Sequence, residues 1–383
     1  MPHFNKKMIS FFMTTKCNLR CRYCYNADER RAITEQTIPL DLARAGIDWY
    51  FANTPYRHIR FYGPGEPTQA FEEIKEISAY AKNHPNHGDD VTSEIQTNGV
   101  FTEKIRDWML DNMNIMWMSF DGMPEIQNYN RPLNPLFKKF YGGKSSAEVL
   151  ENNVRWLIKN KENRNLMVGA RVTITDKTID RQKEMVDYFY SLGIRHVWTN
   201  PEFYEVGRIP VCQDEIKKKG FHFDMDRYVE YYLEAFQYAK GKNLQWGSFL
   251  TINFDGESPY HCRCCDPKSA PHLTPDGYIS ACDMVVLGEE AYHMSPFVVG
   301  KWDSAKQEFI WYEDKVKALN ERKSTNIGHC KSCPAKCHCG GYCLGETVNT
   351  TGRLDGQDLV KCKAVRKLLE KLGTSEPYPY LHP

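Results

Sequence analysis

The grouping of the cysteines constrains this chain more than any other feature of its sequence. The 383 residues include 14 cysteines, which lie near the N-terminus and after residue 260, with Cys212 alone between the two groups. Residues 1–15 lack the apolar run and the cleavage site of a signal peptide, so we expect a cytoplasmic protein. Because the cytosol keeps thiols reduced, clustered cysteines in a chain of this size indicate metal binding rather than disulfides.

Composition excludes several other classes of protein. Lys and Arg number 50 and Asp and Glu 49, so the net charge of +1 gives no reason to expect nucleic acid or a membrane surface as a partner. No apolar run approaches the ~20 residues that span a bilayer. The hydrophobic fraction of 41% is sufficient for a large core and argues against a disordered chain.

Short apolar segments alternate with amphipathic segments from residue 8 to about residue 240. We expect strands at 9–13, 58–62, 92–97, 115–120, 167–174 and 196–200, and helices at 39–52, 71–84, 102–112, 147–160, 179–192 and 225–240. This alternation predicts parallel βα units, and six of them form an α/β, TIM-like (β/α)6 barrel, partial or closed. Active residues of such barrels follow the strand ends, where this chain has Cys17, Gly65, Asn98, Asp121 and Thr175.

The pattern divides the chain into two expected domains. Residues 1–240 form the barrel, and residues 241–383 form a domain rich in Cys, Gly and Pro with short elements only. Residues 203–225 read as a solvated insertion, and residues 375–383 as an irregular tail.

The first cysteines have the spacing C-x3-C-x2-C, at Cys17, Cys21 and Cys24. Three thiolates on one loop hold three irons of a [4Fe–4S] cluster and leave the fourth iron free to bind a small molecule. A structural zinc ion normally takes a fourth protein ligand, and none is obvious nearby in the sequence.

At these residues the chain resembles the radical S-adenosylmethionine superfamily, whose signature is this triplet with an aromatic residue, here Tyr23, before the last cysteine. The resemblance implies that the unique iron binds S-adenosylmethionine (AdoMet) and that reduction yields a 5′-deoxyadenosyl radical. The cofactor then supplies the difficult chemistry and the protein positions it.

Further motifs of the same family follow in order, over about residues 8–200. Residues 63–68 resemble the family's G-G-E-P loop, with Pro64 in place of the first glycine, so that one backbone N–H is missing there. The family likeness implies AdoMet contacts from Tyr23, Gly65, Glu66, Pro67, Gln96, Asn98, Ser119, Asp121 and Arg131.

The C-terminal cysteines resemble a SPASM domain, an extension of radical enzymes that modify peptides and proteins. The segment G-x4-C ends at Cys282, and C-x2-C-x5-C-x3-C runs from Cys330 to Cys343. The resemblance implies two auxiliary [4Fe–4S] clusters. The first takes Cys262, Cys265, Cys282 and Cys343, with Cys264 as the alternative to one of them, and the second takes Cys330, Cys333, Cys339 and Cys362. Three clusters then account for eleven of the 14 cysteines, and structural zinc remains the alternative for the C-terminal set.

Asp283 directly follows Cys282, where an aspartate acts as the base in sulfatase-maturing relatives. That branch favours a tyrosine where this chain has Val285, and an aspartate that only caps a loop is the structural alternative.

These observations lead to three hypotheses. The first is a radical AdoMet oxidoreductase and maturase of a ribosomally made peptide (RiPP), which forms a cross-link or an oxidised residue. The second is an anaerobic sulfatase-maturing enzyme that makes formylglycine. The third is a non-catalytic iron–sulfur or zinc scaffold. The expected partners are a peptide or protein substrate, a reductant such as flavodoxin or ferredoxin, and a separate leader-peptide-binding protein, because the barrel begins at about residue 9.

Overall fold

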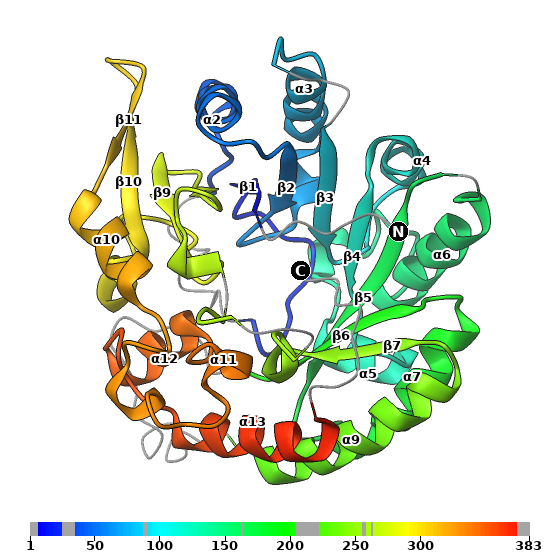
Figure 1. Ribbon diagram of the computed structural model, residues 1–383. Coiled ribbons are helices and arrows are strands. Elements are labelled where there is room, and N and C mark those ends of the chain that lie inside the picture. The colour runs from blue at the N-terminus through cyan, green and yellow to red at the C-terminus, as the bar shows by residue number, and fades with distance from the viewer. Residues whose placement is uncertain are drawn as a thin grey trace.

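The computed structural model describes residues 7–24, 35–86, 91–162, 164–203, 222–254, 258–261 and 263–373. Cys212, Cys262, most of the predicted 203–225 insertion and the predicted tail lie outside the described residues. In Figure 1 the strands curve around the middle of the molecule, and helices α2 to α7 lie on their outer side.

One eleven-stranded sheet has the order β11-β10-β9-β8-β1-β2-β3-β4-β5-β6-β7. The strands are β1 (Ile9–Phe12), β2 (His58–Tyr62), β3 (Thr92–Thr97), β4 (Ile115–Ser119), β5 (Met167–Ile174), β6 (His196–Pro201), β7 (Gln245–Ser248), β8 (His272–Leu273), β9 (Tyr278–Ser280), β10 (Val298–Asp303) and β11 (Glu308–Trp311). Strands β1 to β7 pair in parallel in chain order, which confirms the predicted partial α/β barrel. The sequence prediction missed β7, which has only four residues.

The α-helices of the barrel part are α2 (Leu40–Asn53), α3 (Phe71–Lys82), α4 (Glu103–Asn112), α5 (Pro124–Asn130), α6 (Ser146–Asn160), α7 (Gln182–Ser191) and α9 (Met225–Gly241). Helix α6 shows why they form where predicted. Ser145 and Glu148 make reciprocal capping hydrogen bonds at its N-terminus, and its apolar face, with Leu150, Val154 and Leu157, is buried.

The C-terminal part continues the same sheet. Strand β8 pairs in parallel with β1, and β9, β10 and β11 follow antiparallel. The domain boundary at residue 240 stays a prediction, because this sheet runs through both parts of the chain. Its helices are α10 (Glu313–Glu321), α11 (Lys336–Cys339), α12 (Leu344–Thr351) and α13 (Leu359–Leu372).

The expectation of short elements only after residue 240 was wrong for α13, which has 14 residues. Its residues Ala364, Val365 and Leu368 are buried at helical spacing, and the helix packs against α9 (Figure 1). The high cysteine content of this region concealed an ordinary amphipathic helix.

Large and small residues alternate across the inner strands. Trp117 lies opposite Gly169 on β5, and Trp198 lies opposite Gly247 on β7. A Cβ atom on Gly169 would lie 2.6 Å from the Trp117 ring, so the glycine provides the room that the indole fills. Residues two apart on a strand share a face, so Trp117 lies on the same face as Ser119, and Trp198 on the same face as Asn200. We call the layer formed by these two buried tryptophans the tryptophan floor.

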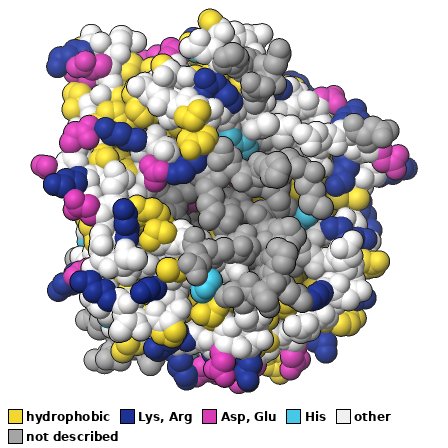
Figure 2. Space-filling model, viewed as in Figure 1, with side chains coloured by type: hydrophobic (Ala, Val, Ile, Leu, Met, Phe, Trp, Pro, Cys, Tyr) yellow, Lys and Arg dark blue, Asp and Glu magenta, His cyan; other side chains and the backbone are white. Residues whose placement is uncertain are grey.

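The surface carries both signs of charge. Figure 2 shows Lys and Arg side chains interspersed with Asp and Glu around one face, as expected for a net charge of +1. None of the helices in the described ranges is both long and apolar enough to cross a bilayer.

The tryptophan floor gives a test of stability. Trp117→Ala would leave a cavity in a fully buried layer and is expected to lower the free energy of unfolding by about 3–5 kcal/mol, measured by urea denaturation with circular dichroism. Phe140→Ala, at a side chain that is 66% exposed, is the control and should change it by about 0.5 kcal/mol or less. Equal effects of the two truncations would contradict this account of the core.

Candidate active site

A cavity of about 270 Å³ lies at the carboxyl ends of the parallel strands. Residues from both ends of the chain line it, including most of those predicted to bind AdoMet. The predicted residues among the lining are Cys17, Cys21, Tyr23, Cys24, Gly65, Glu66, Gln96, Asn98, Ser119, Arg131, Cys264, Cys282, Asp283 and Cys343. Pro67, Asp121 and Cys265 are buried but are not part of this lining.

The cysteine loop rests directly on the loop after β2. The backbone N–H of Gly65 donates to the carbonyl of Thr14 at 3.0 Å, and that of Glu66 donates to the carbonyl of Lys16 at 2.7 Å. A Cβ atom on Gly65 would lie 2.1 Å from the Lys16 carbonyl oxygen, so only glycine permits this approach. The departure at Pro64 leaves both of these contacts intact.

Glu66 ties the ends of β2 and β3 together. Its buried carboxylate accepts hydrogen bonds from the hydroxyls of Thr68 and Thr97, and from the N–H of Asn98 at 2.7 Å. Burial raises the pKa of Glu66, and these hydrogen bonds oppose that shift without cancelling it. The side chain therefore holds the cavity wall in shape.

Asp121 lies behind the cavity, where it holds two residues that line it. Its carboxylate contacts the Arg131 guanidinium at 3.2 Å, accepts the hydroxyl of Tyr23, and also accepts the backbone N–H of Thr173. Burial raises the pKa of Tyr23, with a smaller contribution from Asp121, so the phenol stays protonated. Asp121 thus reaches the cavity through Arg131 and Tyr23.

Asp283 faces the cavity from the C-terminal part and is held by Arg60 of β2. The Arg60 nitrogens contact the two carboxylate oxygens at 2.9 and 3.2 Å, and His272 Nε2 lies 3.6 Å from one of them. Burial alone would lower the pKa of Arg60. The negative charges of Asp283 and Glu94 together have the larger effect, so the pKa of Arg60 is raised. The ion pair holds Asp283 in one orientation with its side chain 31% exposed.

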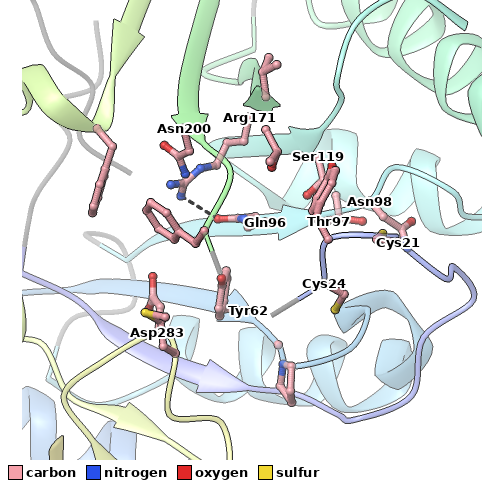
Figure 3. Close-up of a pocket in the computed structure, with 18 of the residues that line it drawn as sticks. Cys21, Cys24, Tyr62, Gln96, Thr97, Asn98, Ser119, Arg171, Asn200 and Asp283 are labelled. Atoms are coloured by element: carbon pink, nitrogen blue, oxygen red, sulfur yellow. Dashed lines mark hydrogen bonds between the residues drawn. The ribbon is translucent and has the colours of Figure 1, made fainter. Parts of the chain in front are cut away.

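The sequence reasoning predicted Gln96 but missed Arg171 and Asn200, which also line the cavity. Figure 3 shows Arg171, Gln96 and Asn200 together on one side, with Asp283 and Tyr62 on another and Cys21 and Cys24 on a third. Arg171 donates to the side-chain oxygen of Gln96 at 2.8 Å. A charged residue inside an otherwise apolar strand was the available signal, both for Arg171 on β5 and for Arg60 on β2.

A second, smaller cavity of about 170 Å³ lies in the C-terminal part. Its lining includes all four cysteines predicted for the second auxiliary cluster, Cys330, Cys333, Cys339 and Cys362. Burial, reinforced by neighbouring thiols, raises the pKa of Cys330 to about 11 and that of Cys339 to about 12. Cys337, which the prediction left unused, does not line this cavity.

Comparison with known proteins agrees with this geometry. Residues 11–189 match the family model of the radical SAM superfamily, over the strands and loops that build the first cavity. These residues form a radical SAM domain. A domain of this superfamily implies AdoMet and an iron–sulfur cluster as cofactors.

Relatives extend the likeness over nearly the whole chain. The radical SAM cyclopropyl synthase TigE of Paramaledivibacter caminithermalis is 20% identical over 96% of this chain and 74% of its own length. Among solved structures, anSMEcpe with bound AdoMet has a TM-score of 0.73 at 15% identity, covering 95% of this chain and 92% of its own. SuiB of Streptococcus suis, bound to its precursor peptide SuiA, has a TM-score of 0.61 at 14% identity, covering 92% and 75%. At these identities the structural matches establish the fold.

The residues of the first cavity fit these cofactors. The three cysteines of the triplet line it together, and the Gly65 approach leaves the backbone of the loop after β2 beside them. Ser119 and Arg131 add a hydroxyl and a guanidinium suited to a carboxylate. In the described part of the chain, no three His, Cys, Asp or Glu side chains converge on a single metal ion.

The loop contact gives a test of AdoMet binding. Gly65→Ala would force the two loops apart and is expected to weaken AdoMet binding by about tenfold or more, measured by anaerobic equilibrium dialysis. Gly241→Ala, where nothing lies within 4 Å of the added carbon, should leave the affinity unchanged. Unaltered binding in Gly65→Ala would remove this loop from the AdoMet site.

Proposed function

We propose that this enzyme is a maturase of a ribosomally made peptide and that it abstracts a hydrogen atom from one residue to form a cross-link or an oxidised residue. The observation that carries this proposal is that one cavity is lined both by the N-terminal cysteine triplet and by Cys282, Cys343 and Asp283. A substrate residue in that space would lie between two redox centres.

AdoMet, when bound and reductively cleaved, supplies a 5′-deoxyadenosyl radical as the hydrogen-atom acceptor. Cys17, Cys21 and Cys24 would hold its cluster, and Ser119, Arg131 and the loop at Gly65 would orient it. Asp283 would take a proton from the substrate, and Arg60 would keep its carboxylate turned toward the cavity.

We further propose three [4Fe–4S] clusters. The second auxiliary cluster would occupy the smaller cavity on Cys330, Cys333, Cys339 and Cys362. For the first, Cys264 lines the main cavity with Cys282 and Cys343 whereas Cys265 does not, which supports the alternative choice of Cys264. Cys262, outside the described residues, would complete the set.

A peptide is the proposed substrate because two of the structural relatives were solved with peptides. SuiB holds the precursor peptide SuiA, and anSMEcpe holds the Cp18Cys peptide together with AdoMet. A reductant such as flavodoxin or ferredoxin and a separate leader-binding protein remain proposed partners.

Formylglycine formation is the second candidate, and the cavity-facing Asp283 is the observation that favours it. Mass spectrometry of the peptide product distinguishes the two reactions. A cross-link or a carbon–carbon double bond resists borohydride, whereas the formylglycine aldehyde is reduced by it.

The role of Asp283 as a base has its own test. If its carboxylate acts as the base in either reaction, Asp283→Asn is expected to lower the rate of product formation by about 100-fold.

Iron content tests the cluster assignment. The anaerobically reconstituted protein is expected to hold about twelve irons per chain, Cys330→Ala about eight, and Cys337→Ala about twelve as the matched control. Cys21→Ala should abolish 5′-deoxyadenosine formation with dithionite as reductant. About four irons together with zinc would contradict the three-cluster proposal, and no 5′-deoxyadenosine from the wild type would contradict the proposed chemistry.

A further inference from the structure

An exposed apolar and basic surface lies against the outside of the cysteine loop. We call it the rim patch and define it by Arg20, Arg22, Tyr129, Leu136, Lys138, Lys139 and Phe140. Leu136 is 83% exposed, Phe140 66% and Tyr129 44%, which are high values for large apolar side chains gathered on one segment. Nothing described so far in the active site uses these residues.

The rim patch is fastened to the cysteine loop by main-chain hydrogen bonds. The N–H of Arg20 donates to the carbonyl of Pro132, and that of Arg22 to the carbonyl of Asn130, each at 2.9 Å. A third bond of the same length joins the N–H of Asn134 to the carbonyl of Asn18. The segment after α5 is therefore held by backbone hydrogen bonds against the loop that carries Cys17, Cys21 and Cys24.

Tyr141 anchors the exposed end of the segment beside Cys17. Its hydroxyl donates to the carbonyl of Val100 at 2.9 Å and accepts from the side-chain amide of Asn18 at 3.0 Å. Its ring packs edge-on to Phe140, with ring centroids 5.0 Å apart. Phe140 is thus presented outward by a fixed neighbour of the cysteine loop.

The described segments that form this surface carry charge of one sign. Residues 16–24 and 129–145 contain no Asp or Glu, and their cationic residues are Lys16, Arg20, Arg22, Arg131, Lys138, Lys139 and Lys144. Lys16 pairs with Glu35 at 3.3 Å and Arg131 with Asp121. Within the described ranges, Arg20, Arg22, Lys138 and Lys139 form no ion pair with a carboxylate. On a chain whose net charge is +1, this is a local concentration of positive charge.

We propose that the rim patch is the docking site of the acidic one-electron carrier that reduces the cluster of the triplet, a protein of the flavodoxin class. The proposal rests on the proposed function, because the cleavage of AdoMet requires an electron. A carrier protein is too large to enter a cavity of about 270 Å³, so it must approach from a surface that contacts the cysteine loop. Small, weak interfaces steered by opposite charge are typical of electron transfer.

The step is balanced in electrons and atoms. The reduced flavin loses one electron and the cluster gains it. That electron would break the bond between sulfur and C5′ of bound AdoMet, giving methionine and the 5′-deoxyadenosyl radical. The radical would take one hydrogen atom from the substrate or, in its absence, from a buffer or reductant molecule, so 5′-deoxyadenosine can be counted without a known peptide substrate.

The test compares two reductants and measures binding separately. With a purified flavodoxin as probe, Lys138→Glu/Lys139→Glu is expected to raise the dissociation constant about tenfold, measured by calorimetry, and to flatten its dependence on salt. Leu136→Ser/Phe140→Ser should weaken binding by a similar factor of about ten, because a central apolar anchor is lost. Flavodoxin-driven formation of 5′-deoxyadenosine should fall in parallel, whereas dithionite-driven formation should stay at the wild-type rate.

The matched control changes the same total charge elsewhere. Lys306→Glu/Lys317→Glu alters two exposed lysines near β10 and on α10, away from the labelled barrel helix α5 in Figure 1. It should leave flavodoxin affinity within about twofold of the wild type. Equal losses in both double variants would mean that bulk charge alone attracts the carrier, and would overturn the proposal.

Two other outcomes also overturn it. If both rim variants bind flavodoxin normally but lose a peptide substrate, the patch belongs to the substrate. If they lose dithionite-driven cleavage as well, the patch only supports the cysteine loop. Absence of dithionite-driven cleavage in the wild type would instead count against the proposed function, so the two failures are distinguishable.

Discussion

The buried guanidinium of Arg60 is the interaction on which the arrangement of the active site depends. Its side chain is fully buried in the sheet, where an unpaired charge would cost several kcal/mol. Glu94 on the neighbouring strand lies 3.5 Å away, and Asp283 supplies a two-point contact from 223 positions later in the chain. The barrel therefore requires the C-terminal part for its own electrostatic balance.

This requirement has a geometric consequence. Asp283 follows Cys282, so fixing the carboxylate on Arg60 also fixes the thiol beside it against the barrel mouth. The sheet contributes only a two-residue pairing at this point, between β1 and β8. The ion pair between Arg60 and Asp283, which His272 also approaches, thus adds a side-chain contact where the backbone pairing of β1 with β8 is short.

Periodicity and motif order predicted much of this structure from the sequence. All six predicted strands match to within one residue at each end, because each is a short apolar run bounded by turn residues. Of the residues placed after strand ends, Cys17, Gly65 and Asn98 line one cavity, because parallel strands carry their carboxyl ends to one side, whereas Asp121 and Thr175 are not part of its lining. Pattern alone did not distinguish Glu66 and Asp121, which shape the wall, from residues that point into the space.

The remaining features depend on partners that are distant in sequence. Arg60 and Arg171 appear as single charges within apolar strands, and only the folded chain shows that one meets Asp283 and the other Gln96. Helix α13 was missed because cysteine spacing dominated the reading of its region, although Ala364, Val365 and Leu368 have helical spacing. The helical propensity of this segment was visible in the sequence, but the prediction gave more weight to the cysteine spacing.

The two sides of the cysteine loop differ in what they can contact. On the inner side, Cys17, Cys21 and Cys24 meet polar residues that are already engaged with one another, such as Arg131 with Asp121. On the outer side, the segment after α5 holds the loop by its backbone and leaves its side chains exposed. Backbone hydrogen bonds keep the cysteine loop in place there, so the side chains of Leu136, Lys138, Lys139 and Phe140 are not needed for that purpose. Large apolar and basic side chains that the fold does not use for its own stability are the residues that a partner protein can use for docking.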